Sequence, residues 1–336
     1  MRKSLLRIAI LTVLGILPYN LALADVDITG SMEFHYVSKD PGTTVSGASN
    51  DYFHNDSKVE IVFSNKTDTG LNISLYQTLR TNNNSNSDSD ESFMTIEGNF
   101  GYLGLGSSGG VGDELTPTAA DLIGPGSTDD KAPQFYSSTG SLTSQQASLI
   151  NIIDNENNIT YKLPTISGLT LGASYKDAGD TASANDDETV FAGSYEMVSG
   201  NLTGTLAYAT NSISGATAGA GGINSSSIGL TLASGPITVI IAQAEDDQST
   251  SIKTEVNDYG FSYAVDDSLT LAVTGTEVTE SLGSEALDVT SVSTKYTIAS
   301  GLDSYITYHD YDYKAGTSGA TSDDGSTTAI TLATTF

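Results

Sequence analysis

The feature that most constrains the fold is an alternation of apolar and polar residues, which recurs in short segments along almost the whole chain. In the first segment, Val26, Ile28, Met32, Phe34 and Tyr36 share one parity, and polar residues fill most positions between them. Successive side chains of a β-strand point to opposite faces, so each set occupies its own face of a strand. Beyond residue 24 the sequence has no apolar run of about 18 residues, which excludes a membrane-spanning helix. The sequence therefore predicts an all-β chain.

The same alternation marks further candidate strands. Their apolar positions are Val59-Ile61-Phe63, Leu71-Ile73-Leu75, Ile159-Tyr161-Leu163, Leu169-Leu171-Tyr175, Leu202-Leu206-Tyr208, Ile228-Leu230-Leu232, Phe261-Tyr263-Val265 and Ile330-Leu332-Phe336. Two segments are less regular, because residues 291–298 change parity after Val289 and residues 302–313 place aromatic side chains on both faces. A β-bulge or an interface face would explain either irregularity.

The connections between these strands alternate in length. Short ones, such as Gly98-Asn99, Ser199-Gly200 and Ser300-Gly301, contain the residues that tight turns require. Between them lie long polar stretches, at residues 38–51, 81–91, 107–155, 178–188, 211–225, 245–252, 280–286 and 314–326. Tight turns at one end and long loops at the other are typical of an outer-membrane barrel. We therefore predict a transmembrane antiparallel β-barrel of about sixteen strands, each of roughly ten residues.

The composition is compatible with such a barrel and excludes several other functions. The formal net charge of -28 argues against a nucleic-acid partner, because phosphate backbones need clustered cations. The absence of cysteine excludes disulfides, thiolate metal sites and thiol nucleophiles. A mean hydropathy of -0.12 would ordinarily indicate a soluble chain, but the lumen-facing half of each barrel strand can be polar. The 17 tyrosines suit the interfacial girdles of a barrel.

Residues 1–24 have the three parts of a cleavable secretory signal. Met1–Arg7 carries three cations, Ile8–Leu17 is apolar, and Ala22–Ala24 supplies small residues at the cleavage site. The apolar run is too short for the alternative, an uncleaved anchor helix. We expect a mature chain, residues 25–336, that forms one barrel domain. It would carry 10 basic and 41 acidic residues, so cleavage makes the protein more acidic.

Several short motifs resemble those of the general diffusion porins of Gram-negative bacteria. Residues 156–164, which run into 168–175, are similar to the strand pair that follows the constriction loop of that family, and residues 100–106 resemble the strand before it. The resemblance implies a sixteen-stranded, homotrimeric barrel in the bacterial outer membrane, with segment 107–155 folded into the lumen as the constriction loop. It implies passive diffusion of small hydrophilic solutes and ions, and contact with outer-membrane lipid and lipopolysaccharide.

Two details of the resemblance concern single positions. Ile330, Leu332 and the terminal Phe336 are similar to the signal that the barrel-assembly machinery reads. Family members commonly follow the glycine-rich strand with Gly-Arg-Gln, whereas here Gly106 precedes residues 107–110 of sequence Ser-Ser-Gly-Gly. This departure removes a cation from the pore wall, so a strong transverse field across the constriction is in doubt.

Charged residues of the predicted loop and wall suggest how the pore would filter ions. The loop acids are Asp113, Glu114, Asp121, Asp129 and Asp130. The wall residues with lumen parity are Lys58, Glu60, Arg80 and Lys162, with Arg80 near the outer rim. The hypothesis is that the first three loop acids face Lys58 and Lys162 across the constriction and give a cation preference. The alternative is that these acids point into solvent or bind one another through water.

Other chemistry is weakly supported. Acidic clusters at 88–91, 186–188, 246–247 and 323–324 offer oxygen ligands that suit Ca²⁺, but none has calcium-loop spacing. We therefore expect solvated loop tips and no cofactor. Loop-bound Ca²⁺ is the alternative. The three histidines lack metal-ligand spacing. Residues 104–110 match a dinucleotide fingerprint and a serine elbow, but both motifs need a following helix, so we expect no enzyme.

Two other functions remain open at this stage. A channel selective for sugars or dicarboxylates is the nearest alternative, because Tyr76, Tyr102 and other lumen-side aromatic residues could form a sugar track. A secreted acidic β-rich adhesin would account for the glycine, threonine and acid content. It would not account for the alternating loop lengths or for the terminal Phe336.

Overall fold

The computed structural model describes residues 25–41, 51–82, 88–122, 124, 156–177, 187–214, 223–249, 252–281, 285–316 and 322–336. Within these ranges the strands are β1 (Asp25–Pro41), β2 (Tyr52–Lys66), β3 (Asn72–Asn82), β4 (Asp88–Gly98), β5 (Gly101–Ser108), β6 (Glu156–Lys162), β7 (Leu169–Lys176), β8 (Asp187–Ser199), β9 (Leu202–Ser214), β10 (Ile223–Ser234), β11 (Ile237–Ser249), β12 (Ile252–Ala264), β13 (Leu269–Glu280), β14 (Ala286–Ala299), β15 (Leu302–Lys314) and β16 (Asp323–Thr335). The predicted signal, residues 1–24, lies outside the described residues.

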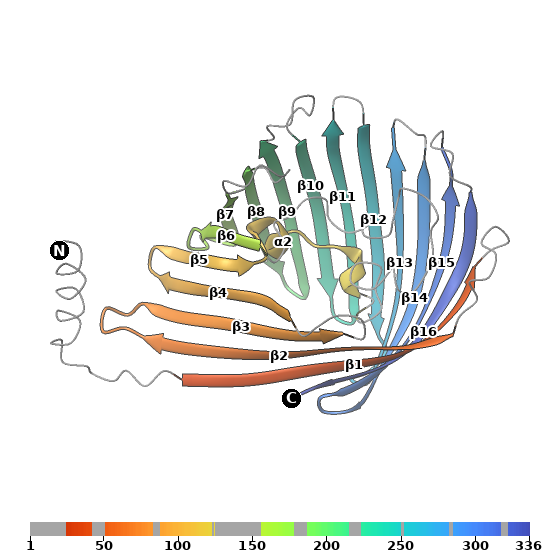
Figure 1. Ribbon diagram of the computed structural model, residues 1–336, viewed down its shortest axis with the longest axis horizontal. Coiled ribbons are helices and arrows are strands. Elements are labelled where there is room, and N and C mark those ends of the chain that lie inside the picture. Colours follow the sequence, from red (N-terminus) through yellow and green to blue (C-terminus); the bar gives the residue numbers. More distant parts are fainter. Residues whose placement is uncertain are drawn as a thin grey trace, which may run out of the picture.

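The strands form a single closed barrel in which each strand pairs antiparallel with its neighbours in sequence (Figure 1). The barrel closes where β1 pairs with β16, from Ser31 opposite Thr335 to Pro41 opposite Gly325. The predicted sixteen-stranded antiparallel barrel is therefore confirmed. Among the described residues, no helix is both long enough and apolar enough to cross a membrane.

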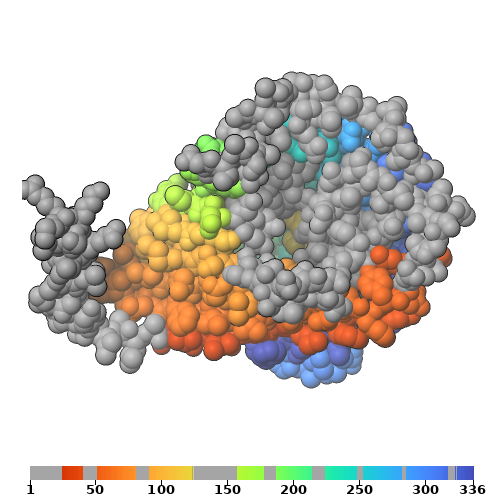
Figure 2. Space-filling model, viewed as in Figure 1, coloured from red at the N-terminus to blue at the C-terminus, as the bar shows by residue number. Residues whose placement is uncertain are grey.

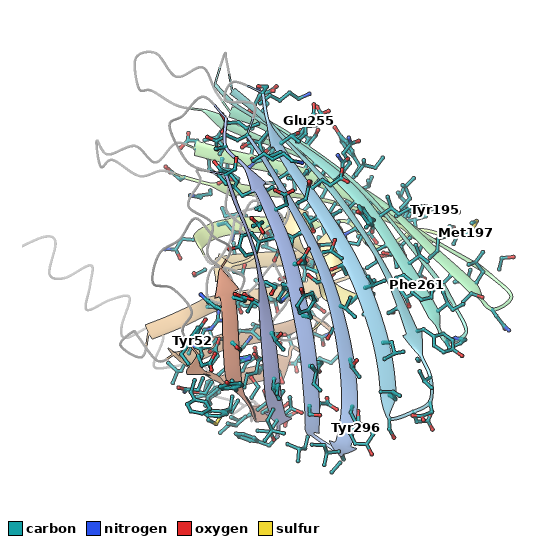
Figure 3. All side chains as sticks on the ribbon, turned by 90° about the vertical axis from the view of Figure 1, so that its right-hand side faces the viewer. Tyr52, Tyr195, Met197, Glu255, Phe261 and Tyr296 are labelled. Carbon is teal, nitrogen blue, oxygen red and sulfur yellow. The ribbon has the colours of Figure 1, made fainter. Side chains whose placement is uncertain are left out.

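The alternation in the sequence separates the two faces of the wall. Large apolar side chains such as Ile28, Phe191 and Ile306 are exposed on the outer face, whereas Thr307 and His35, at inward positions, are fully buried. Tyr195, Met197 and Phe261 point away from the barrel in Figure 3. Strands β1 to β5 present a continuous outer surface in Figure 2. An apolar outer face is what a barrel needs in lipid, because all backbone groups are already paired within the wall.

This polarity reverses at the long-loop end of β11 to β15. There the inward residues form an apolar cluster: Ala244, Val256, Val278, Leu287, Val289, Tyr311 and Tyr313. The outward positions are polar instead and include the acids Glu245, Glu277 and Asp288, and Glu255 lies at the far end of the wall in Figure 3. Water rather than lipid must therefore surround this part of the wall, because an outward row of carboxylates would be strongly unfavourable in hydrocarbon.

The reversal explains where the sequence prediction of strand ends was wrong. Predicted loop 245–252 is almost entirely strand, since β11 runs to Ser249 and β12 starts at Ile252. The parity change after Val289 is not a bulge, because β14 pairs with β13 without interruption at this residue. The aromatic residues on both faces of β15 reflect the same reversal, with Tyr311 and Tyr313 inward and buried.

The last residue of the chain occupies a defined place at the seam of the barrel. Phe336 exchanges two backbone hydrogen bonds with Gly30 of β1, with N···O distances of 2.8 and 3.0 Å. Its ring covers Gly30 so closely that a Cβ there would lie 2.6 Å from the ring carbons. The terminal aromatic residue therefore needs a position without a side chain on the neighbouring strand.

Candidate functional site in the barrel lumen

The chain re-enters the barrel directly after β5. Two short helices follow, α2 (Val111–Leu115) and η1 (Ala119–Leu122), and both lie inside the barrel (Figure 1). α2 contacts β6 to β9, and η1 contacts β11 to β13. We call the described part of this segment, residues 109–124 without residue 123, the lumen loop. The predicted inward-folded third loop is therefore confirmed for this part, whereas residues 125–155 lie outside the described residues.

The wall beneath the lumen loop is lined with small residues. Inward-facing glycines lie directly under three of its side chains: a Cβ at Gly172 would lie 2.5 Å from Val111, one at Gly229 would lie 2.7 Å from Pro117, and one at Gly260 would lie 2.8 Å from Leu122. Val111 also packs against Val190, Ala192 and Ala209. The lumen loop can therefore pack closely against the wall, because its side chains occupy the space above wall residues that have no side chain.

Polar groups fix the two helices to the wall. The backbone N–H of Val111 donates to Ser174 Oγ at 2.8 Å. At η1, the N–H of Ala119 and the hydroxyl of Thr118 both donate to Asp258 Oδ2, at 2.5 and 2.9 Å, and Thr276 donates to Oδ1 at 3.0 Å. Asp258 is only 5% exposed, so this buried carboxylate depends on these donors. Asp258 is not among the site residues predicted from the sequence, where its only signal is an acid at an inward position of a strand.

The structure places the predicted loop acids in different settings. Asp113 and Glu114 lie in the first turn of α2 and Asp121 in η1, and all three are exposed. Glu114 forms an ion pair with Lys162 of β6. Lys162 therefore contacts its predicted partner directly instead of facing it across the lumen. Asp129 and Asp130 lie outside the described residues.

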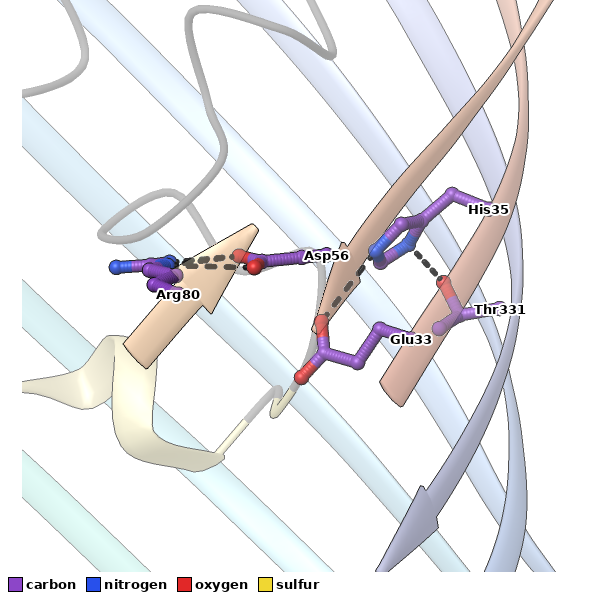
Figure 4. Close-up of polar contacts among 5 residues, drawn as sticks. All are labelled: Glu33, His35, Asp56, Arg80 and Thr331. Atoms are coloured by element: carbon purple, nitrogen blue, oxygen red, sulfur yellow. Dashed lines mark hydrogen bonds and ion pairs between the residues drawn. The ribbon is translucent and has the colours of Figure 1, made fainter. Parts of the chain in front are cut away.

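The other predicted wall residues belong to the seam side of the barrel. Arg80 of β3 donates to both oxygens of Asp56 on β2, with a shortest distance of 2.7 Å (Figure 4). Lys58 and Glu60 line a groove of about 560 Å³ together with Gly301 and Phe336. Lys58 forms no ion pair with any other residue that the structure describes. These two residues lie at the β1–β16 seam, whereas the lumen loop packs on the opposite strands.

The histidines are inward and buried, but nothing described indicates a metal site. His35 Nδ1 lies 2.7 Å from Thr331 Oγ1, and its Nε2 lies 3.3 Å from a carboxylate oxygen of Glu33 (Figure 4). His54 is its cross-strand neighbour, and His309 bonds to Ser291. Within the described ranges, no group of three or more histidine and carboxylate side chains is arranged to hold a metal ion. The four acidic clusters lie within or beside strands β4, β8, β11 and β16, and the prediction of no cofactor, with loop-bound Ca²⁺ as its alternative, stays a prediction.

Aromatic side chains gather on the inner face beside the lumen loop. Tyr76 of β3 and Phe93 of β4 are cross-strand partners whose ring centroids lie 4.5 Å apart with nearly parallel planes. Tyr102 of β5 lies under Lys162, whose Nζ is 4.0 Å from the ring centroid. The inward position of Tyr76 and Tyr102 agrees with the sequence analysis, which did not include Phe93.

Comparison with known proteins gives the family. A profile of the Gram-negative porin family matches residues 13–335. No individually curated protein shows significant sequence similarity to the chain. Among solved structures, OmpF of Salmonella typhi in complex with daunomycin superposes with a TM-score of 0.71 at 13% identity, covering 95% of this chain and 99% of that chain.

Two further structures show the same fold. OmpT of Vibrio cholerae in its trimer form has a TM-score of 0.67 at 14% identity, covering 93% of this chain and 99% of that one. An anion-selective porin from Comamonas acidovorans has a TM-score of 0.63 at 17% identity, covering 93% and 100%. With a closed barrel, an inward loop and a family match over nearly the whole length, the chain belongs to the Gram-negative porin family and is a channel protein of the outer membrane.

Proposed function

We propose that the protein passes small hydrophilic solutes and ions by passive diffusion and prefers cations. The observation that carries the cation preference is the balance of charge on the inner face. Four inward cations are each paired with a carboxylate: Arg80 with Asp56, Lys162 with Glu114, Lys176 with Glu188 and Lys295 with Asp303. Lys58 is inward without an ion pair among the described residues, and Glu60 lies beside it. Further exposed carboxylates, Asp113 and Asp121 on the loop and Glu97 on the wall, add to this balance.

The physical consequence is a net negative potential in the narrow part of the lumen. In a water-filled constriction, an excess of carboxylates over cations raises the local concentration of cations and lowers that of anions. The fold does not determine this sign, because the Comamonas acidovorans relative is named as anion-selective. The proposal therefore depends on the side chains of this chain alone.

The test is the reversal potential of the purified protein in a planar bilayer that separates two KCl concentrations. We expect a cation-selective potential, reduced in Asp113→Asn and further reduced in the double variant with Asp121→Asn. Asp267→Asn, in the tight turn between β12 and β13, is the matched control and should leave the potential unchanged. Anion selectivity of the unmodified protein would contradict the proposal.

We also propose a homotrimer that contacts outer-membrane lipid and lipopolysaccharide and is inserted by the barrel-assembly machinery. The trimer form of the Vibrio cholerae relative supports the homotrimer. The exposed apolar outer wall supports the contact with lipid. Porins are generally channels and not enzymes, so the proposed function involves no bond-making. The outer-membrane location disfavours the secreted adhesin considered above. Cross-linking of the native protein, followed by gel electrophoresis without heating, would reveal the trimer.

A further inference from the structure

The aromatic residues beside the lumen loop form a stacked pair with one face turned toward a glycine. Phe93 lies between two cross-strand neighbours, Tyr76 on β3 and Gly106 on β5. Tyr76 covers one face of the Phe93 ring, at a centroid distance of 4.5 Å and an interplanar angle of 7°. On the other side, β5 contributes no side chain at this register position.

The backbone conformation of Gly106 requires a glycine at this position. Its φ of 128° is strongly disfavoured for residues with a side chain, and a Cβ would lie 2.5 Å from the carbonyl oxygen of Ser92. No larger residue fits there without moving β4 or β5. The second face of Phe93 is therefore bordered by backbone, and the ring is partly exposed.

Negatively and positively charged side chains border the same part of the wall. Tyr102, on the same strand as Gly106, pairs with Glu97 across β4 and β5. Lys162 lies over the Tyr102 ring and is paired with Glu114 of the lumen loop. Tyr102 is also within electrostatic range of Glu114, Tyr76 and Glu97. The aromatic rings thus lie among two carboxylates and one ammonium group.

We propose that this cluster binds the ring of a neutral sugar during its passage through the lumen; the cluster comprises Tyr76, Phe93, Glu97, Tyr102, Glu114 and Lys162. A pyranose has a flat face of C–H groups, which packs against the electron-rich face of an aromatic ring. Its rim carries hydroxyls, which donate to carboxylates and accept from an ammonium group. The inference rests on the proposed diffusion function and names one class of solute.

The charges of the cluster distinguish a sugar from a dicarboxylate. A dicarboxylate needs cations with unused capacity, but Lys162 is already matched by Glu114. A matched ion pair still offers donors and acceptors to hydroxyl groups, and this suits a neutral polyol. From Tyr102 to Gly106 the site spans about 13 Å along β5, which is long enough for more than one sugar ring.

The experiment measures block of the ion current by sugars in planar bilayers. We expect maltotriose to reduce the single-channel current of the unmodified protein at lower concentration than glucose does. Sorbitol, which has the hydroxyls of glucose but no ring, should be much weaker than glucose. Phe93→Ala should raise the half-blocking concentration of maltotriose about two- to tenfold, the range expected for loss of one ring contact. Tyr76→Ala should have a similar effect.

The controls separate this inference from the proposed function. Phe191→Ala, the same change on the outer wall, should leave the block unchanged, and Phe93→Leu keeps apolar volume in case the alanine variant fails to form channels. Equal block by glucose and sorbitol, or unaltered block in Phe93→Leu and Tyr76→Ala, would overturn the sugar site while the channel still conducts. Failure of the unmodified protein to conduct ions would instead overturn the proposed function and the inference with it.

Discussion

Asp258 should decide whether η1 of the lumen loop stays against the barrel wall. Its carboxylate accepts hydrogen bonds from the loop backbone at Ala119 and from the loop hydroxyl of Thr118, while Thr276 holds the other oxygen. In Asp258→Ala, both loop donors lose their acceptor in a buried site, so the loop should leave the wall far more often.

The expected size of this effect follows from those contacts. A hydrogen bond to a charged group contributes ~1.5–3 kcal/mol, so the two loop bonds set an upper bound of about 3–6 kcal/mol. Water that enters the vacated site recovers part of this, and we take about 2 kcal/mol as the net loss. This corresponds to a roughly 30-fold change in the ratio of docked to released η1.

Single-channel recording is the direct assay, because a released loop moves into the path of the ions. We expect frequent partial closures in Asp258→Ala that are rare in the unmodified protein. Asp258→Asn keeps one acceptor oxygen and should show an intermediate frequency. The barrel should still migrate as a heat-modifiable species, since the strand pairing is untouched. Steady currents in Asp258→Ala, with a correctly assembled barrel, would refute the role of this carboxylate.

Three further predictions follow from close contacts and burial. Gly260→Leu places a side chain where Leu122 now lies, so the single-channel conductance should change, and an unchanged conductance would contradict the packing of Leu122 on Gly260. Gly30→Val removes the space for the Phe336 ring, and the fraction of assembled barrel in outer-membrane fractions should fall, whereas retention at the normal level would contradict the seating of Phe336. Leu287→Asp puts a charge into the buried apolar cluster and should lower the temperature of the heat-modifiable transition; an unchanged temperature would show that the cluster is wet.

The barrel was predictable from the sequence because its dominant signal, period two, is local. Parity places Lys58 and Lys162 on the inner face, and both are there. The alternation does not determine how high along the barrel axis a side chain lies, or where around the barrel. Both depend on the register of the sixteen strand pairings. For this reason Lys162 was expected opposite Glu114 but contacts it, and Lys58 lies at the β1–β16 seam beside Phe336.

Other features were hidden for different physical reasons. The seat of the lumen loop consists of inward glycines on β7, β10 and β12, which read individually as turn or flexible positions. The ends of β11 and β12 were assigned to a loop, residues 245–252, because their apolar residues do not lie on the outer face. Beyond the lipid, the outer face of the wall meets water and the inner face is buried. The alternation of apolar and polar residues therefore continues, but with the apolar residues on the inner face.

The outward acidic residues at the long-loop end of the barrel, called the rim here, also affect the conductance of the channel at low salt concentration. On its outer side Glu277, Asp288, Asp312 and Asp324 are directly paired across four neighbouring strands, with Lys314 as the nearby cation. At 0.1 M salt the field of such a row fades within about 10 Å, but in dilute salt near 0.01 M it reaches about 30 Å. The mouth would then collect counter-ions from a volume much wider than itself. Conductance should therefore fall more slowly than the salt concentration as the bath is diluted.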